Sequence, residues 1–281
     1  MDMANVGTSS RVPAVQAFGL KWELPVEVLL QRAATKPRTG VECQRPTGPS
    51  SASRLQRAIR PPNLKRLEFD SDMPVNTVSW PASLQELSFD TEFNQPIVGV
   101  PWPASLQNLS YGTKFNQPIA KVAWPASLQK LSFGVHFNQP NAEVVWPAGL
   151  KRLSLGVHFN QPIAEVAWPA CLKSLSFGVH FNQPISQVVW TACLKRLSFG
   201  RCFNRPIVRV ARPASLQKLS FGRCFKQPIV GVAWPVSLRR LSLGTEFNQP
   251  IAGIVWPASL LQLSFGVDFA HRWNGRPPYT V

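Results

Sequence analysis

The chain has 281 residues, of which 44% are hydrophobic, and its formal net charge is +16. No apolar run approaches the roughly 18 residues that a membrane-spanning helix needs. The segment from Met1 to Asn5 lacks the basic region and apolar core with which a secretory signal begins. A soluble intracellular protein, cytoplasmic by default, is therefore expected. Five cysteines, an odd number in so long a chain, argue against a disulfide framework.

Residues 1–59 are predicted to form a flexible N-terminal arm. Stretches such as 35–40 and 46–51 are rich in proline, glycine and polar residues. Segments of this composition cannot bury enough apolar surface to order themselves. The arm is therefore not expected to belong to the folded core.

One short helix is expected within this arm, at residues 24–34. Pro25 suits the first turn of a helix, and Glu27 favours its positive end. The hexapeptide Leu-Pro-Val-Glu-Val-Leu at 24–29 resembles the opening of an F-box, the helical module that docks ubiquitin-ligase adaptors. The residues after Ala34 lack the further apolar helices of such a module, so a short packing helix is the alternative.

Residues 60–79 are predicted to be a degenerate capping coil. Leu64, Leu67 and Phe69 match apolar positions of the later units, but two residues are missing before Trp80. The turn that follows is acidic, which suits a terminal coil whose outer face meets water.

Residues 80–270 consist of nine units of 22 residues, of which the last is incomplete. A period this strict predicts a solenoid whose coils contact mainly their neighbours. Equivalent residues should then lie about 4.8 Å apart, so that each position of the unit becomes a ladder along the molecule. The units begin at Trp80, Trp102, Trp124, Trp146, Trp168, Trp190, Arg212, Trp234 and Trp256.

Each unit is predicted to contain one short strand. In the first unit, Leu87 and Phe89 alternate with Ser88 and should point inward. Two prolines in each unit, Pro81 and Pro96 in the first, leave little room for a helix.

Two further positions of the unit carry structural predictions. A glycine follows the strand directly, where it is expected to take a positive φ and turn the corner. An asparagine recurs later in the unit and is expected to link its side-chain amide from coil to coil and to satisfy turn carbonyls. The glycines are Gly112, Gly134, Gly156, Gly178, Gly200, Gly222, Gly244 and Gly266, and the asparagines are Asn94, Asn116, Asn138, Asn160, Asn182, Asn204 and Asn248.

Residues 271–281 depart from the repeat and are predicted to be a C-terminal cap or tail. Trp273 in this segment is expected to fold over the last coil.

The repeated unit resembles a known family. Phe-Asn-Gln-Pro-Ile followed by Trp-Pro-Ala-Ser-Leu-x-x-Leu-Ser-Phe-Gly, as in residues 115–134, is similar to the FNIP repeat, a leucine-rich-repeat relative named for its Phe-Asn-Ile-Pro core. The resemblance covers about residues 60–270. It implies a mainly β, leucine-rich-repeat-like solenoid of 22-residue coils with short parallel strands, to which the composition of residues 1–59 adds a poorly ordered N-terminal arm. It also implies an interaction module, as members of that family are generally regarded, some of which carry an F-box ahead of the repeats. The resemblance brings no catalytic residues.

Basic residues supply the candidate partner-binding surface. From Lys195 to Arg240 the chain has eleven basic residues and no acidic one, and such a cluster would focus a positive field. The outward strand position adds a basic stripe. The alternative is a solvated surface without a partner. The candidate residues are Lys130, Arg152, Lys195, Arg196, Arg201, Arg205, Arg209, Arg212, Lys218, Arg223, Lys226, Arg239 and Arg240.

No metal, cofactor or catalytic site is expected. His136, His158 and His180 are followed by Cys202 and Cys224 in one column, but a straight ladder brings only two neighbours to one ion, whereas closed zinc sites need three or four ligands. No spacing places a His and an Asp to activate the recurring serines. The cysteines are expected to be reduced thiols.

Three functional hypotheses follow. The first is a non-enzymatic, monomeric scaffold that binds an unidentified protein partner through its strand face. The second is a salt-dependent binder of nucleic acid or another anionic polymer. The third, a ubiquitin-ligase substrate adaptor, requires that residues 24–34 belong to a divergent F-box.

Overall fold

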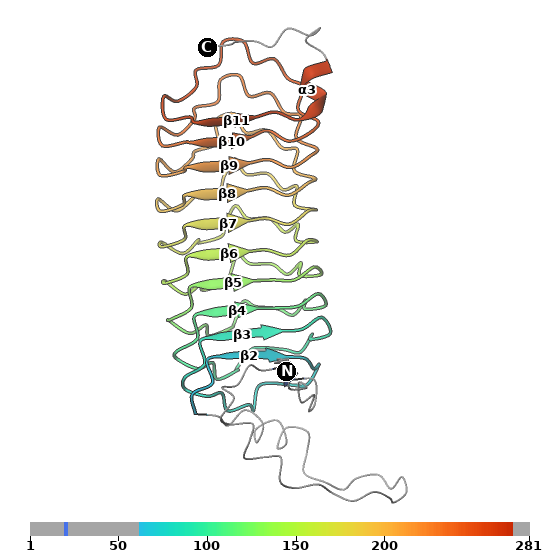
Figure 1. Ribbon diagram of the computed structural model, residues 1–281, viewed down its shortest axis with the longest axis vertical. Coiled ribbons are helices and arrows are strands. Elements are labelled where there is room, and N and C mark those ends of the chain that lie inside the picture. The colour runs from blue at the N-terminus through green and yellow to red at the C-terminus, as the bar shows by residue number, and fades with distance from the viewer. Residues whose placement is uncertain (1–19, 22–61, 272–281) are drawn as a thin grey trace, which may run out of the picture.

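The computed structural model describes residues 20–21 and 62–271. Within these residues, eleven strands form one sheet in chain order from β1 to β11. Figure 1 shows β2 to β11 stacked along the long axis of the molecule, with the helix α3 at the C-terminal end. The prediction of a mainly β solenoid with short parallel strands is confirmed.

The strands recur at one position of every coil. Neighbouring strands from β3 to β11 are paired in parallel with residues 22 apart facing each other, as Leu131 faces Leu153. The pair β2–β3 is offset by 20 residues instead, since Leu67 faces Leu87. The elements are β1 (Leu20–Lys21), β2 (Arg66–Phe69), β3 (Glu86–Phe89), β4 (Asn108–Ser110), β5 (Lys130–Ser132), β6 (Arg152–Ser154), β7 (Ser174–Ser176), β8 (Arg196–Ser198), β9 (Lys218–Ser220), β10 (Arg240–Ser242), β11 (Gln262–Ser264) and α3 (Val267–His271).

Each strand from β4 to β10 buries its leucine and presents its other two residues outward. In β5, Leu131 is fully buried, Lys130 is exposed and Ser132 is half-buried. Most of the strands begin one residue before the predicted Leu-Ser-Phe segment and end at the serine. The outward residue that opens each strand is therefore held by the backbone ladder itself.

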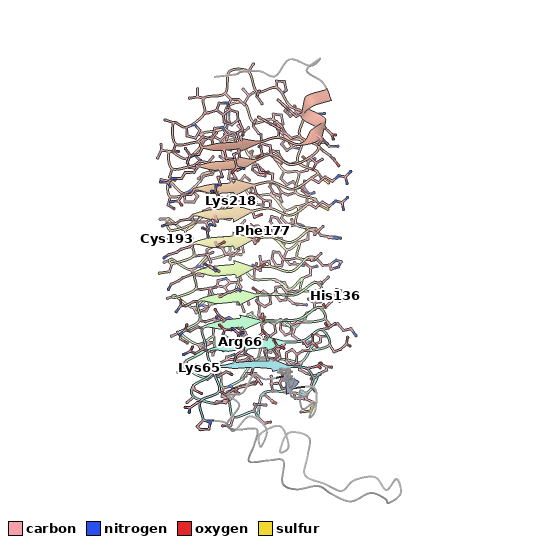
Figure 2. All side chains as sticks on the ribbon, in the orientation of Figure 1. Lys65, Arg66, His136, Phe177, Cys193 and Lys218 are labelled. Carbon is pink, nitrogen blue, oxygen red and sulfur yellow. The ribbon has the colours of Figure 1, made fainter. Side chains whose placement is uncertain are left out.

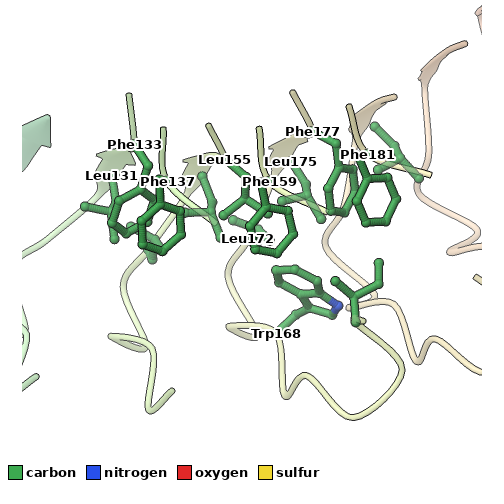
Figure 3. Close-up of a cluster of buried hydrophobic side chains, with 14 of the residues drawn as sticks. Leu131, Phe133, Phe137, Leu155, Phe159, Trp168, Leu172, Leu175, Phe177 and Phe181 are labelled. Atoms are coloured by element: carbon green, nitrogen blue, oxygen red, sulfur yellow. The ribbon is translucent and has the colours of Figure 1, made fainter. Parts of the chain in front are cut away.

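Phenylalanine rings form the centre of the core. Phe159 is fully buried, and its ring centroid lies 6.2 Å from those of Phe137 and Phe181 in the neighbouring coils. Figure 3 shows a second row beside it, in which Leu155 stands between Phe133 and Phe177. Burial of one such ring contributes roughly 1.5–3 kcal/mol, and both faces of an inner ring are covered only by neighbouring coils. The core is therefore continuous from coil to coil.

Arg212 stands where the other units have tryptophan. Its guanidinium donates to the carbonyl oxygens of Val210 (3.1 Å) and Ile207 (2.8 Å) and lies 5.5 Å from the ring of Trp234. Burial lowers the pKa of this guanidinium to about 10. The side chain replaces part of the tryptophan stack with hydrogen bonds to its own coil.

The reason for the glycine after each strand differs from the prediction. Of the eight glycines at this position, only Gly244 has a positive φ, at 78°. A Cβ added to Gly178 would lie 1.9 Å from the carbonyl oxygen of Gly156 in the preceding coil. From Gly112 onward the coils approach so closely at this corner that a Cβ would overlap the backbone of the preceding coil, so glycine is required by that contact rather than by a left-handed backbone; Asp90 fills the position in the first unit.

The asparagine ladder is present, but the glutamine that follows most of these asparagines makes some of the hydrogen bonds between coils. The Oδ1 atom of Asn138 accepts the backbone N–H of Asn160 at 2.9 Å. The backbone carbonyl of Asn138 accepts instead from Nε2 of Gln161, at 3.0 Å. Thus asparagine satisfies a backbone donor and glutamine satisfies the turn carbonyl. The amides of neighbouring coils are linked as well, but by Nε2 of Gln161 donating to Oδ1 of Asn138 at 3.1 Å rather than from one asparagine to the next.

Strand β1 was not predicted. Leu20 and Lys21 pair antiparallel with Phe69 and Glu68 of β2, so a two-residue segment of the N-terminal region covers this edge of the sheet. The predicted helix at 24–34, the rest of the arm and Trp273 lie outside the described residues. No helix in the described ranges is long and apolar enough to cross a membrane.

Candidate functional site

The strand face carries a continuous group of cations between β5 and β10. We call this group the basic strand face. It combines the residues that open the strands with those immediately before them, and every member is exposed. Its members are Lys130, Lys151, Arg152, Lys173, Lys195, Arg196, Lys218, Arg239 and Arg240.

The basic strand face has no acidic counterpart among its neighbours. The outward positions of β5 to β11 carry lysine, arginine, serine and glutamine only. None of the nine cations forms an ion pair with an acidic side chain in the part of the chain that the structure describes. Lys151 donates to Oε1 of Gln129 at 2.9 Å. Uncompensated charges on a rigid surface create a positive potential outside it.

Seven of the thirteen candidate residues lie on this face, and the other six lie elsewhere on the coil. One coil takes 22 residues to run around the perimeter, so basic residues that are close in sequence point in different directions. The seven are Lys130, Arg152, Lys195, Arg196, Lys218, Arg239 and Arg240, and the six are Arg201, Arg205, Arg209, Arg212, Arg223 and Lys226.

Several of the six already have partners. Arg223 and Lys226 both bind Glu246, at 3.0 and 2.9 Å. The hydrogen bond with Glu246 raises the pKa of Lys226, and the same contact lowers the pKa of Glu246. Arg205 donates from Nε to the carbonyl of Asn182 at 2.7 Å. These side chains contribute to the structure of their own corner rather than to the basic strand face.

Sequence reasoning missed Lys151 and Lys173. Both precede the strand by one residue, in the column that holds Gln85 in the first unit. The backbone carbonyl of Lys151 accepts from the N–H groups of Lys173 and Ser174, at 2.9 and 3.0 Å, so this column extends the strand ladder. A prediction that grouped the position before each strand with the strand itself would have identified both lysines.

Serine hydroxyls and two cations line a shallow, open concavity of about 260 Å³ near the C-terminal end of the face. Lys218 faces Arg240 in the paired strands β9 and β10, and Ser220 faces Ser242. Ser242 in turn faces Ser264 of β11. Gln262, Leu219 and Leu241 complete the lining.

The opposite end of the strand face is acidic. A second concavity of about 260 Å³ is lined by Glu68, Asp70, Ser88, Phe89 and Asp90. Glu86, which opens β3, accepts from Nε of Arg66 at 2.7 Å. Carboxylates thus outnumber the cations Lys65 and Arg66 around β2 and β3, whereas the outward positions of β5 to β11 carry no carboxylate.

The histidine and cysteine columns lie away from this face. Figure 2 places His136 and Cys193 at opposite edges of the solenoid, with Lys218 between them. The ring centroids of His136 and His158 are 5.4 Å apart, and those of His158 and His180 are 4.7 Å apart. The described residues contain no group of three or more His, Cys, Asp or Glu that could hold a metal ion.

Cys171 and Cys193 are free and exposed, and they occupy a column that is serine in most units. At this position Ser127 donates to the carbonyl of Leu106 at 2.7 Å, which ties one coil to the preceding one. A thiol is a weak donor. The two cysteines therefore interrupt a ladder of side-chain to backbone hydrogen bonds.

Replacing Cys171 and Cys193 with serine is expected to raise the free energy of unfolding by about 1 kcal/mol for each site, because each hydroxyl would donate to the preceding coil. Urea denaturation followed by tryptophan fluorescence measures the change. Cys202→Ser and Cys224→Ser are the matched controls, since their column has no serine ladder, and they should change stability by less than about 0.5 kcal/mol. Equal effects at all four cysteines would refute the ladder explanation.

Comparison with known proteins places these features in context. A sequence model described as FNIP Repeat matches residues 93–136, 115–158, 137–180, 159–190, 181–224 and 225–268. The chain is also similar to a solved structure described as CroV588, a novel circular LRR protein, with 40% identity and a TM-score of 0.71. This match covers 75% of the chain and 31% of CroV588, so the chain spans less than a third of the length of that protein. A search of curated proteins finds no match.

Proposed function

The chain belongs to the FNIP repeat family, and we propose that it is a non-enzymatic scaffold whose strand face binds a protein partner. The leucine-rich-repeat-like solenoid supports this proposal, because stacked repeats present long, continuous surfaces suited to binding.

The contrast between the inner and outer columns of the strands is the observation that carries the proposal. The inward strand position is leucine in every strand from β2 to β11. The outward position that opens the strand varies from Glu86 to Asn108, Lys130 and Ser174. A constant core thus holds a variable surface at a fixed spacing of about 4.8 Å, and such a surface can distinguish one partner from another.

Rigidity also favours a binding role. Each strand from β2 to β10 is bonded to both neighbours along the solenoid, and the aromatic core continues without interruption from Phe93 to Phe247. Little conformational freedom is then lost when a partner docks, which lowers the entropic cost of association.

Substituting Ser154 with tryptophan tests the proposal directly. Ser154 points outward at the centre of the strand face, and a tryptophan there would prevent a flat partner from approaching β5 to β7. We expect affinity capture from the cells that contain the protein, compared by quantitative mass spectrometry, to lose its main partner by at least about tenfold.

The matched control is Ala167→Trp, which adds the same side chain at an exposed position of the return segment. Capture by this variant should equal that of the unmodified chain. If Ser154→Trp retains its partners while Ala167→Trp loses them, the return face is the binding surface and the proposal fails.

Binding of nucleic acid is the second candidate, because the basic strand face would attract phosphates. No aromatic ring lies at the outward positions of β2 to β11, so bases have nothing on which to stack. Capture at low and at high salt separates the two functions, since nucleic acid should be released steeply by salt whereas a packed protein interface persists.

A further inference from the structure

We propose that the partner segment is phosphorylated, and that its phosphoryl group is held at the concavity formed by Lys218, Arg240 and the serines of β9 to β11. This inference rests on the proposed function of the strand face and names the chemistry of its partner. The concavity has about 260 Å³ and is open to solvent. It is therefore smaller and shallower than the sites that enclose a free small molecule, and suits one group on a larger partner.

The lining matches the chemistry of a phosphoryl group. Lys218 supplies a point charge with three donors, and Arg240 supplies a planar fork that can bind two oxygens at once. The hydroxyls of Ser220, Ser242 and Ser264 lie in one row on neighbouring strands and can each donate. A phosphomonoester carries nearly two negative charges and three acceptor oxygens, so it can use more of these donors than a carboxylate.

The surroundings would hold the rest of an anionic segment. The basic strand face continues from the concavity back to β5, with Arg196, Lys195 and Arg152 along the way. Six strand spacings of about 4.8 Å separate β5 from β11, a distance of roughly 29 Å that about nine extended residues can span. Acidic residues flanking a phosphorylated one would face cations over this length.

The acidic end of the face fixes the position of such a segment. Glu68 on β2 would repel a phosphorylated or acidic chain, whereas the charge of Glu86 on β3 is compensated by Arg66. An anionic partner is thereby directed to the part of the face between β5 and β11.

A protein segment fits this face better than a nucleic acid does. Single-stranded nucleic acids gain much of their affinity from bases that stack on aromatic rings. The outward positions of β5 to β11 offer hydroxyls, amides and cations but no ring. Hydroxyls and an arginine can bind an oxyanion here, and this contact does not require a stacked nucleobase.

The test uses the full-length protein and fluorescein-labelled nine-residue peptides with one phosphoserine close to either end, two glutamates and otherwise glycine and alanine. Fluorescence anisotropy at about 150 mM salt should show binding at least about tenfold tighter than for the same peptide with serine. Lys218→Gln combined with Arg240→Gln should remove most of this preference. Inorganic phosphate should compete with the phosphopeptide, whereas chloride at equal ionic strength should not.

The matched control combines Lys121→Gln with Arg201→Gln, two exposed cations outside the strand face, and removes the same charge. This variant should bind the phosphopeptide within about twofold of the unmodified protein. Equal losses in both double variants, no preference for the phosphopeptide, or tighter binding of an oligonucleotide of equal charge would each overturn the inference.

The two proposals fail in distinguishable ways. If the partner captured from cells is lost on Ser154→Trp but retained by the Lys218→Gln and Arg240→Gln variant, the strand face is the binding surface and its partner is not phosphorylated. If Ser154→Trp loses no partner, the proposed function fails before the anion site is considered.

Discussion

Replacing Gly178 with alanine is expected to lower the free energy of unfolding by about 3 kcal/mol or more. The added Cβ would lie 1.9 Å from the carbonyl oxygen and 2.5 Å from the carbonyl carbon of Gly156, and 2.6 Å from Cα of Val157. All three are backbone atoms, so no side-chain rotation can relieve the overlap. The coils would have to separate at this corner, which breaks the continuous ladder on both sides of the substitution.

Gly231→Ala is the matched control for this experiment. Gly231 has a φ of +77°, and a Cβ added there meets nothing within 4 Å. Alanine at that position would suffer backbone strain but no steric overlap, and the strain should lower the free energy of unfolding by about 1–2 kcal/mol. Denaturation of both variants, followed by tryptophan fluorescence and by circular dichroism, compares the two causes. A loss at Gly178 no greater than the loss at Gly231 would contradict the close-contact explanation.

The same glycine shows how far periodicity can be read from the sequence. The repeat places Gly178 correctly at the corner after the strand, because a 22-residue period leaves no other register. It does not give the reason for the glycine, since a positive φ and a close backbone contact both select the residue without a Cβ. Only the distance to Gly156 distinguishes them.

The part of the candidate surface that follows the 22-residue period could be predicted from the sequence. Adding 22 to Arg196 gives Lys218 and then Arg240, and these three lie in paired strands. Proximity in sequence was a poorer guide. Arg201 and Arg205 follow Arg196 closely in the sequence. The chain turns a corner after the strand that Arg196 opens, so Arg201 and Arg205 lie outside the basic strand face.

The N-terminal edge strand could not be predicted from the sequence. Leu20 and Lys21 have no periodic pattern around them, and their partners Phe69 and Glu68 lie far along the chain. Two-residue pairings of this kind are determined by the open edge of β2, which is a property of the assembled sheet rather than of the segment that covers it.

Replacing Asn141 with isoleucine is expected to raise the free energy of unfolding by about 2–3 kcal/mol. Asn141 is 1% exposed, and neither Oδ1 nor Nδ2 has a hydrogen-bond partner. The equivalent residues in the adjacent coils, Ile119 and Ile163, are fully buried. Isoleucine would remove a buried unsatisfied amide and restore the apolar column, so both changes favour the folded state.

The asparagine ladder supplies the matched comparison. Asn160 belongs to the same residue type but accepts the backbone N–H of Asn182 at 2.9 Å and Nε2 of Gln183 at 3.2 Å. Asn160→Ala leaves the backbone N–H of Asn182 without its acceptor and should cost about 1–2 kcal/mol, although Nε2 of Gln183 keeps the backbone carbonyl of Asn160 at 2.9 Å. Opposite signs for the two variants in urea denaturation are therefore expected, because burial of an amide stabilises a coil only where the amide has partners. A loss of stability in Asn141→Ile would show that this amide is satisfied in solution, and the buried-polar argument would fail.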